Sequence, residues 1–317
     1  MRFIAAKKYM RLIFLFLALS IPALAQSGWK KVPLPDSHGL YLEKGRPSKK
    51  AGYDIWQTTI TPRGWLLLFP GMGMSDLEGE AAIARNMVSY GIVTVVPRIN
   101  NRLFWERQAE KAIEDITAAI RNEEGLTDSL AVFIGGFSSG GHLALTLAEN
   151  RLLSGQRVDA VFAVDPPTDL LAYYEMGQRR IQMNACPLLI REGKQMVEML
   201  EKYFGGSPSA DTCSRYSAYS HTGGGRAKVL TQTPVRLYAE PDTAFWKKEF
   251  CGAIEYEDLN AASATGLMQF LQDAGNKQAK LILTQHKGFW HGRRFPHAWS
   301  IAEPAELAEW LGSMLKK

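Results

Sequence analysis

Short apolar runs alternate with amphipathic stretches along most of this chain. The apolar runs have the length of buried parallel strands, which face a core on both sides of a sheet. The amphipathic stretches place apolar residues at the spacing of a helix that covers a sheet face. The predicted strands are 39–45, 53–61, 64–70, 92–99, 129–137, 159–167, 234–242 and 279–286, and the predicted helices are 77–91, 105–122, 142–153, 262–274 and 302–317.

This alternation predicts an α/β fold, a mostly parallel twisted sheet with helices on both faces. In such sheets reactive residues gather at the carboxyl ends of the strands. Residues 169–232 break the rhythm with helical and turn-rich segments. We interpret them as an inserted helical cap over that edge of the sheet. The alternative is an enlarged connection without a functional role.

The first 25 residues have the pattern of a secretory signal peptide. Four basic residues precede a ten-residue apolar stretch at 12–21, and Ala23-Leu24-Ala25 forms a small-x-small cleavage site. The apolar stretch is too short to span a bilayer, and no longer apolar run follows it. We therefore expect a secreted or periplasmic protein with one domain at 26–317 and no stable membrane span after the leader is removed.

The net charge changes meaning once the leader is set aside. The whole chain carries 37 basic and 32 acidic residues, a balance of +5. The leader contains four of the basic residues and none of the acidic ones, leaving 33 against 32, or +1. Such a balance does not indicate a nucleic-acid partner. Histidine and carboxylate residues form no cluster with metal-ligand spacing, so we expect no metal and no cofactor.

Three cysteines follow the leader, at positions 186, 213 and 251. An exported protein can hold one pair as a disulfide and leave the third thiol free. Cys186 and Cys213 both fall in the inserted segment, which favours them as the pair. Three buried free thiols is the alternative.

A G-x-S-x-G pattern lies between a predicted strand and a predicted helix, at Gly136-Phe137-Ser138-Ser139-Gly140. A sharp strand-to-helix turn of this kind exposes its serine hydroxyl at a helix N-terminus and needs tiny residues two positions away on either side. The pattern predicts a nucleophile elbow with Ser138 as the nucleophile. Centring the motif on Ser139 would put Phe137 where a glycine is required. The alternative is a glycine- and serine-rich loop without chemistry.

A serine nucleophile needs a general base, and in this type of site the base follows the serine in the chain. Of the six histidines, His286 ends the last predicted strand, and His291 and His297 follow it. His297 lies directly before the terminal helix, on a loop that can fold back across the strand ends. We favour His297, and keep His286 and His291 as alternatives.

The base in turn needs a carboxylate that fixes its tautomer. Asp242 follows a predicted buried strand and is the favoured acid. Glu240 is its natural substitute, and Asp165 and Asp169 after the preceding strand are further alternatives. Any of these could instead be a turn residue or a helix cap.

Two backbone N–H groups are expected to stabilise a developing oxyanion. One belongs to Ser139, the residue after the nucleophile. Met72 supplies the other, in the glycine-rich loop that follows the strand at 64–70. Trp246 and Trp290 flank the acid and base positions and are candidates for lining a substrate pocket, with core packing as the alternative.

These motifs together resemble the α/β-hydrolase superfamily of serine hydrolases, in particular its esterase and prolyl-oligopeptidase-like branches. The resemblance is carried by FPGMG (69–73), GGFSSGG (135–141), AEPDTAF (239–245) and PHAWS (296–300), and residues 203–220 resemble the cap segment of secreted bacterial esterases. It implies Ser138 as nucleophile, Asp242 as acid, His297 as base, and an oxyanion hole at Met72 and Ser139. The chain lacks the His-Gly-Gly-Gly loop of many lipases, and Ala239 stands where the family usually has glycine.

The resemblance predicts hydrolysis of a small-molecule carboxylic ester through an acyl-enzyme intermediate. A serine peptidase of the same fold is the first alternative. A catalytically inactive binding module is the second.

Overall fold

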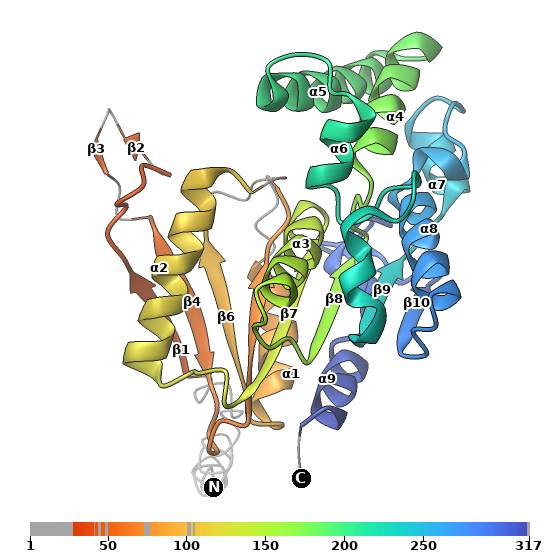
Figure 1. Ribbon diagram of the computed structural model, residues 1–317. Coiled ribbons are helices and arrows are strands. Elements are labelled where there is room, and N and C mark those ends of the chain that lie inside the picture. Colours follow the sequence, from red (N-terminus) through yellow and green to blue (C-terminus); the bar gives the residue numbers. More distant parts are fainter. Residues whose placement is uncertain are drawn as a thin grey trace, which may run out of the picture.

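An eight-stranded sheet forms the centre of the computed structural model, which describes residues 28–40, 42–43, 46–47, 50–72, 77–99, 103 and 105–315 (Figure 1). Two strands at one edge run antiparallel to their neighbours, and the other six are mutually parallel. This confirms the predicted fold class. In spatial order the strands are β1 (Gly28–Pro33), β4 (Gly52–Gln57), β6 (Ile92–Arg98), β5 (Gly64–Phe69), β7 (Ala131–Phe137), β8 (Ala160–Val164), β9 (Val235–Ala239) and β10 (Ala279–Leu283).

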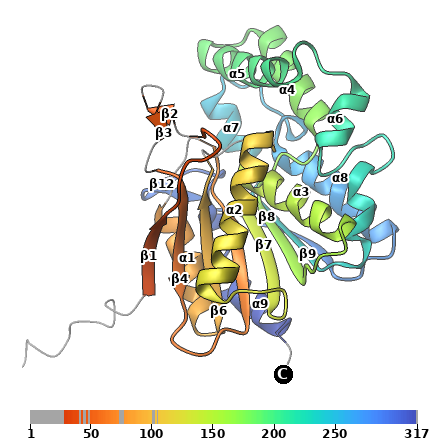
Figure 2. The same cartoon turned by 60° about the vertical axis from the view of Figure 1, so that its left-hand side comes forward.

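Helices cover both faces of this sheet, and each face has its own apolar core (Figures 1 and 2). One core packs under α2 (Arg107–Glu124), α3 (Ser139–Leu153) and α8 (Asn260–Asp273). The other packs under α1 (Leu77–Val88) and α9 (Pro304–Ser313). The central strands are buried along their whole length, as their continuous apolar runs predict.

The antiparallel edge differs from the prediction. The sequence predicted strands at 39–45 and 53–61, but β4 pairs with β1, a strand that the sequence did not indicate. The earlier segment contributes only β2 (Leu42–Glu43), which forms a small hairpin with β3 (Arg46–Pro47). The sequence of β1, GWKKVP, is almost wholly exposed at the sheet edge, so it carries no apolar run that would have marked it as a strand.

The inserted segment contains three helices that rise above the carboxyl ends of the strands (Figures 1 and 2). They are α4 (Leu170–Met183), α5 (Pro187–Phe204) and α6 (Ala210–Tyr216), which we call the cap helices, and η1 (Gly225–Gln232) leads back to β9. Asp169 begins the insertion as the N-cap of α4, where its carboxylate accepts from the backbone N–H groups of Leu171 and Ala172.

Several short elements lie after β9 and have no counterpart in the sequence prediction. Each is too short to show a periodic pattern of apolar residues. They are α7 (Thr243–Glu249), η2 (Tyr256–Asp258), the hairpin of β11 (Phe289–Trp290) and β12 (Arg293–Arg294), and η3 (Trp299–Ile301).

The disulfide joins Cys186 to Cys251, so the predicted Cys186–Cys213 pair is wrong. Cys186 is the N-cap of α5 and Cys251 follows α7, with 6.3 Å between their Cα atoms. Cys213 is a free, fully buried thiol in α6, packed with Leu170 and Leu200. Membership of one insertion was a poor guide to the pairing, because α6 turns Cys213 into the core of the cap and away from the start of α5.

The predicted leader at 1–25 lies outside the described residues. Within the ranges that the structure describes, no helix combines the length and the apolar character needed to cross a membrane.

Candidate active site

Ser138 lies on a tight turn between the end of β7 and the start of α3. Its backbone has φ 53° and ψ −123°, a conformation that costs energy for a residue other than glycine. The flanking glycines are required by space: a Cβ on Gly136 would lie 2.2 Å from the carbonyl oxygen of Gly140, and a Cβ on Gly140 would lie 2.3 Å from those of Phe69 and Pro70. The turn therefore has the geometry expected of a nucleophile elbow.

His297 reaches Ser138 from the loop between β12 and η3. Its Nε2 lies 2.9 Å from Ser138 Oγ, and its Nδ1 lies 2.5 Å from Asp165 Oδ2. When Nδ1–H donates to the carboxylate, Nε2 is left to accept the hydroxyl proton. Phe137 packs against the imidazole with ring centroids 4.7 Å apart, which helps to fix its orientation. A hydroxyl, an imidazole and a carboxylate thus lie in series.

Asp165, and not the favoured Asp242, is the carboxylate that contacts His297. Asp165 follows β8, the strand directly beside β7, whereas Asp242 follows β9, one strand further from Ser138. Two hydrogen bonds hold the backbone of Asp165: its N–H donates to Tyr238 O, and its carbonyl oxygen accepts from the side-chain amide of Asn260. Asp165 was among the sequence alternatives, but nothing in the chain said which strand would neighbour the elbow.

Asp242 and Glu240 have structural partners instead. Asp242 caps α7 by accepting from Phe245 N–H at 2.9 Å, and it pairs with Arg294 at 2.7 Å. Glu240 also pairs with Arg294 and accepts from the backbone N–H groups of Lys287 and Gly288 at 2.9 and 2.8 Å. The two carboxylates and the arginine clamp the 285–294 segment onto the end of β9.

The remaining alternatives lie away from Ser138. His286 and His291 are exposed residues around the β11–β12 hairpin. Asp169 caps α4 and pairs with His221. In the part of the chain that the structure describes, no group of three His, Cys, Asp or Glu side chains is arranged to hold a metal ion.

Met72 and Ser139 come together as predicted, but with an unexpected contact. The backbone N–H of Met72 donates to the side-chain hydroxyl of Ser139 at 2.6 Å. Ser139 is the first residue of α3, so its own N–H has no acceptor within the helix. Two backbone donors therefore lie beside Ser138, one of them engaged by a hydroxyl.

A cleft of about 750 Å³ lies over Ser138 and His297, between the sheet edge and the cap helices. Trp246 and Trp290 both line it, as the sequence suggested. Trp299 is only 2% exposed and donates its Nε1–H to Glu80 beneath the site. The other aromatic residues of the cleft wall are Tyr173, Phe245, Phe250 and Phe295.

Solved structures resemble this chain over most of its length. The order and direction of the strands, with Ser138 on the turn after the central one, decide the class. The fold is that of the α/β-hydrolases. No protein-family model matches the chain, and no curated protein sequence matches it. Similar structures are an esterase from the bacterial hormone-sensitive lipase family (14% identity, TM-score 0.54, 94% of this chain and 88% of that one), carboxyl esterase 2 from the mycorrhizal fungus Tuber melanosporum (13%, 0.55, 94% and 89%) and MPT51 of Mycobacterium tuberculosis (12%, 0.53, 91% and 99%).

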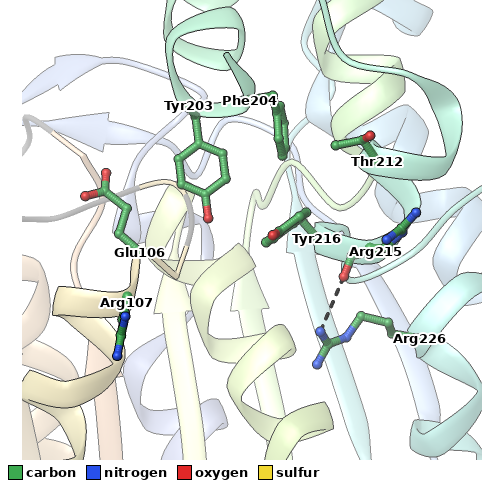
Figure 3. Close-up of a pocket in the computed structure, with 8 residues that line it drawn as sticks. All are labelled: Glu106, Arg107, Tyr203, Phe204, Thr212, Arg215, Tyr216 and Arg226. Atoms are coloured by element: carbon green, nitrogen blue, oxygen red, sulfur yellow. Dashed lines mark hydrogen bonds between the residues drawn. The ribbon is translucent and has the colours of Figure 1, made fainter. Parts of the chain in front are cut away.

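A second cavity of about 760 Å³ opens on the outside of this α/β-hydrolase fold, between the cap helices and the start of α2 (Figure 3). We call it the outer crevice. The side chains that line it are mainly aromatic and cationic (Figure 3), and no histidine is among these lining residues. Its lining consists of Glu106, Arg107, Tyr203, Phe204, Thr212, Arg215, Tyr216 and Arg226.

His142 is a buried residue that contacts one lining residue of each cavity. It lies one turn into α3, with Nδ1 2.9 Å from Pro167 O on the cleft side and Nε2 3.0 Å from Tyr216 O on the crevice side. Burial lowers the pKa of His142 from 6.5 to about 4, outweighing the two carbonyl contacts that favour the charged form. The ring is therefore neutral at pH 7.

Proposed function

We propose that this protein is a serine hydrolase that cleaves carboxylic esters through an acyl-enzyme. The observation that carries the proposal is the unbroken series of hydrogen bonds from Ser138 through His297 to Asp165 at the floor of a large cleft. The structural neighbours described as esterases support the same chemistry. We assign Ser138 as nucleophile, His297 as base and Asp165 as the acid that orients it.

In the first half of the reaction, Ser138 Oγ attacks the ester carbonyl carbon while its proton passes to His297 Nε2. The carbonyl oxygen becomes an oxyanion, which accepts a hydrogen bond from the Ser139 backbone N–H. The Met72 N–H donates a second hydrogen bond to the oxyanion once it no longer donates to the Ser139 hydroxyl. The bond to the alcohol oxygen then breaks, and that oxygen takes the proton from His297. The alcohol leaves and the acyl group stays on Ser138.

In the second half, water attacks the acyl carbon and gives its proton to His297 Nε2. The bond to Ser138 Oγ breaks, and the serine recovers its proton from His297. The carboxylic acid departs and the enzyme is regenerated. Asp165 remains ionised throughout and stabilises the imidazolium that forms twice in each cycle.

The proposal includes export from the cytoplasm. The leader pattern of residues 1–25 supports it, and so does the Cys186–Cys251 disulfide, because such bonds persist in oxidising compartments. We place the protein's ester substrate in the periplasm or outside the cell.

The test is hydrolysis of a chain-length series of p-nitrophenyl esters, beside matched anilides, by wild type and Ser138→Ala. We expect ester cleavage that falls by about a thousandfold or more in the variant. We also expect a serine-directed phosphonate to label Ser138 of the folded protein. Anilide cleavage at rates comparable with the esters would replace esterase by peptidase, and a folded protein without ester cleavage or labelling would refute the proposal.

A further inference from the structure

We propose that the alcohol portion of the natural ester carries an aromatic ring, which binds against an aromatic wall beside His297. The inference rests on the proposed ester hydrolysis and names the substrate class of that same site. It concerns the leaving group and makes no demand on the acyl chain.

The wall consists of Phe245, Trp246, Trp290 and Phe295, all of which line the Ser138 cleft. Its rings are in mutual contact: centroids are 5.1 Å apart for Phe245 and Trp246, 5.6 Å for Trp246 and Phe295, and 6.1 Å for Trp290 and Phe295. Edge-to-face and tilted arrangements predominate, and these are the geometries in which a further ring extends the series favourably.

The wall begins at the base. The Phe295 ring lies 6.2 Å from the His297 imidazole at an interplanar angle of 74°. The proton that His297 carries must be delivered to the alcohol oxygen, so that oxygen has to lie next to the imidazole when the ester bond breaks. Groups attached to the alcohol oxygen therefore extend from His297 along the wall. The acyl chain leaves the reacting carbon in another direction.

The wall is held in place before any substrate arrives. Phe295 directly follows Arg294 in the chain, and Trp290 lies in β11, which pairs with the strand that bears Arg294. The Arg294 guanidinium binds Glu240 and Asp242 and lies 5.7 Å from the Phe245 ring centroid. Asp242 in turn caps the helix that bears Phe245 and Trp246. The contacts among Arg294, Glu240 and Asp242 thus hold both the segment that bears Phe245 and Trp246 and the segment that bears Trp290 and Phe295. At 36% exposed, Trp290 stands at the open side of the cleft.

The experiment compares two pairs of esters that differ only in whether a ring is aromatic or saturated. Benzyl and cyclohexylmethyl acetate vary the alcohol side, and methyl phenylacetate and methyl cyclohexylacetate vary the acyl side. We expect wild type to prefer the benzyl ester by about 3- to 10-fold in kcat/KM, after correction for the alkaline hydrolysis rates. The acyl pair should show no comparable preference.

Trp246→Leu should bring the alcohol-side ratio close to one. Trp290→Leu, at a more exposed position, gives an independent second variant should the first fail to fold. Trp29→Leu is the matched control, because Trp29 is an exposed residue of β1 that packs on Trp56 and lies outside the cleft lining. It should leave both ratios unchanged.

A preference on the acyl side alone, the absence of any preference, or ratios insensitive to both cleft variants would overturn the inference. Direct binding separates it from the proposed function. Calorimetric titration of Ser138→Ala with 2-naphthylmethanol and with its fully saturated counterpart measures the affinity of the wall for each alcohol without turnover. Tighter binding of the aromatic alcohol that is lost with Trp246→Leu supports the wall even if no ester is cleaved, and equal binding refutes it.

Discussion

The Ser138 cleft and the outer crevice are almost equal in volume, about 750 and 760 Å³, but they differ in what their polar groups do. In the cleft, Ser138, His297 and two backbone donors converge on one small space. In the crevice, Arg226 is bound to Glu149 and to the carbonyl of Arg215, and Arg215 pairs with Asp211. The volume of a cavity therefore does not identify a reactive site. A reactive site is identified by proton donors and acceptors that lie within hydrogen-bond distance of one another.

The cap helices also treat the two cavities differently. On the cleft side the Cys186–Cys251 disulfide ties α5 to the segment after α7. On the crevice side Cys213 stays reduced in α6, and burial raises its pKa to about 11, which keeps the thiol protonated and unreactive. Covalent rigidity is thus placed where the substrate is proposed to bind.

The largest effect is expected within the Ser138 cleft, where each of the two candidate acids is replaced in turn by asparagine. Asp165→Asn should lower kcat by about 10³- to 10⁴-fold, because an amide cannot hold the productive tautomer of His297. Asp242→Asn, the matched control, should lower kcat less than about tenfold and act mainly on KM, since Asp242 supports the aromatic wall. Steady-state kinetics on one ester series decides between them, and the reverse ranking would return the acid to Asp242.

Breaking the tether should have the next largest effect. Replacing Cys186 and Cys251 with serine opens a 65-residue connection and should lower the free energy of unfolding by about 4 kcal/mol, measured by urea denaturation. Thiol titration of denatured, unreduced wild type should find one free thiol, that of Cys213. Three free thiols, or an unchanged stability in the double variant, would contradict the pairing.

Acid should lower the stability of the folded protein through His142. Its pKa is about 4 in the folded protein and about 6.5 when unfolded, so the unfolded state takes up the proton first. The contribution is fully present above pH 6.5 and is lost as pH falls toward 4, about 3 kcal/mol between pH 7.5 and pH 4. In urea denaturation, the free energy of unfolding of His142→Gln should fall by about 3 kcal/mol less than that of wild type between pH 7.5 and pH 4. Equal pH dependence in both proteins would refute this assignment.

The smallest effect is expected in the outer crevice. Arg215 is exposed and pairs with Asp211, four residues away on the same helix. Arg215→Gln should change kcat/KM for any ester by less than about twofold, and it should leave the midpoint of urea denaturation nearly unchanged. A large loss of activity in a variant of normal stability would show that the crevice takes part in the reaction.

The sequence carried the fold class and two members of the proposed triad, for identifiable reasons. Ser138 sits in a motif whose glycines are required by close backbone contacts, and His297 follows the last strand of the sheet. Asp165 was not favoured as the acid because the order of strands in the sheet cannot be read from a local sequence pattern. β8 lies beside β7 in the sheet, and the residues around Asp165 and Asp242 do not indicate this. The Cys186–Cys251 pair depends in the same way on how separate segments meet.

Two of the three proposed catalytic residues have left-handed backbone conformations, with φ 53° at Ser138 and φ 47° at Asp165. Each such conformation costs a residue other than glycine about 1 kcal/mol or more. Glycine would satisfy both positions at lower conformational energy, but it has neither a hydroxyl nor a carboxylate. Folding and catalysis thus make opposite demands on these positions, and selection for thermal stability alone would remove the residues on which the proposed activity depends.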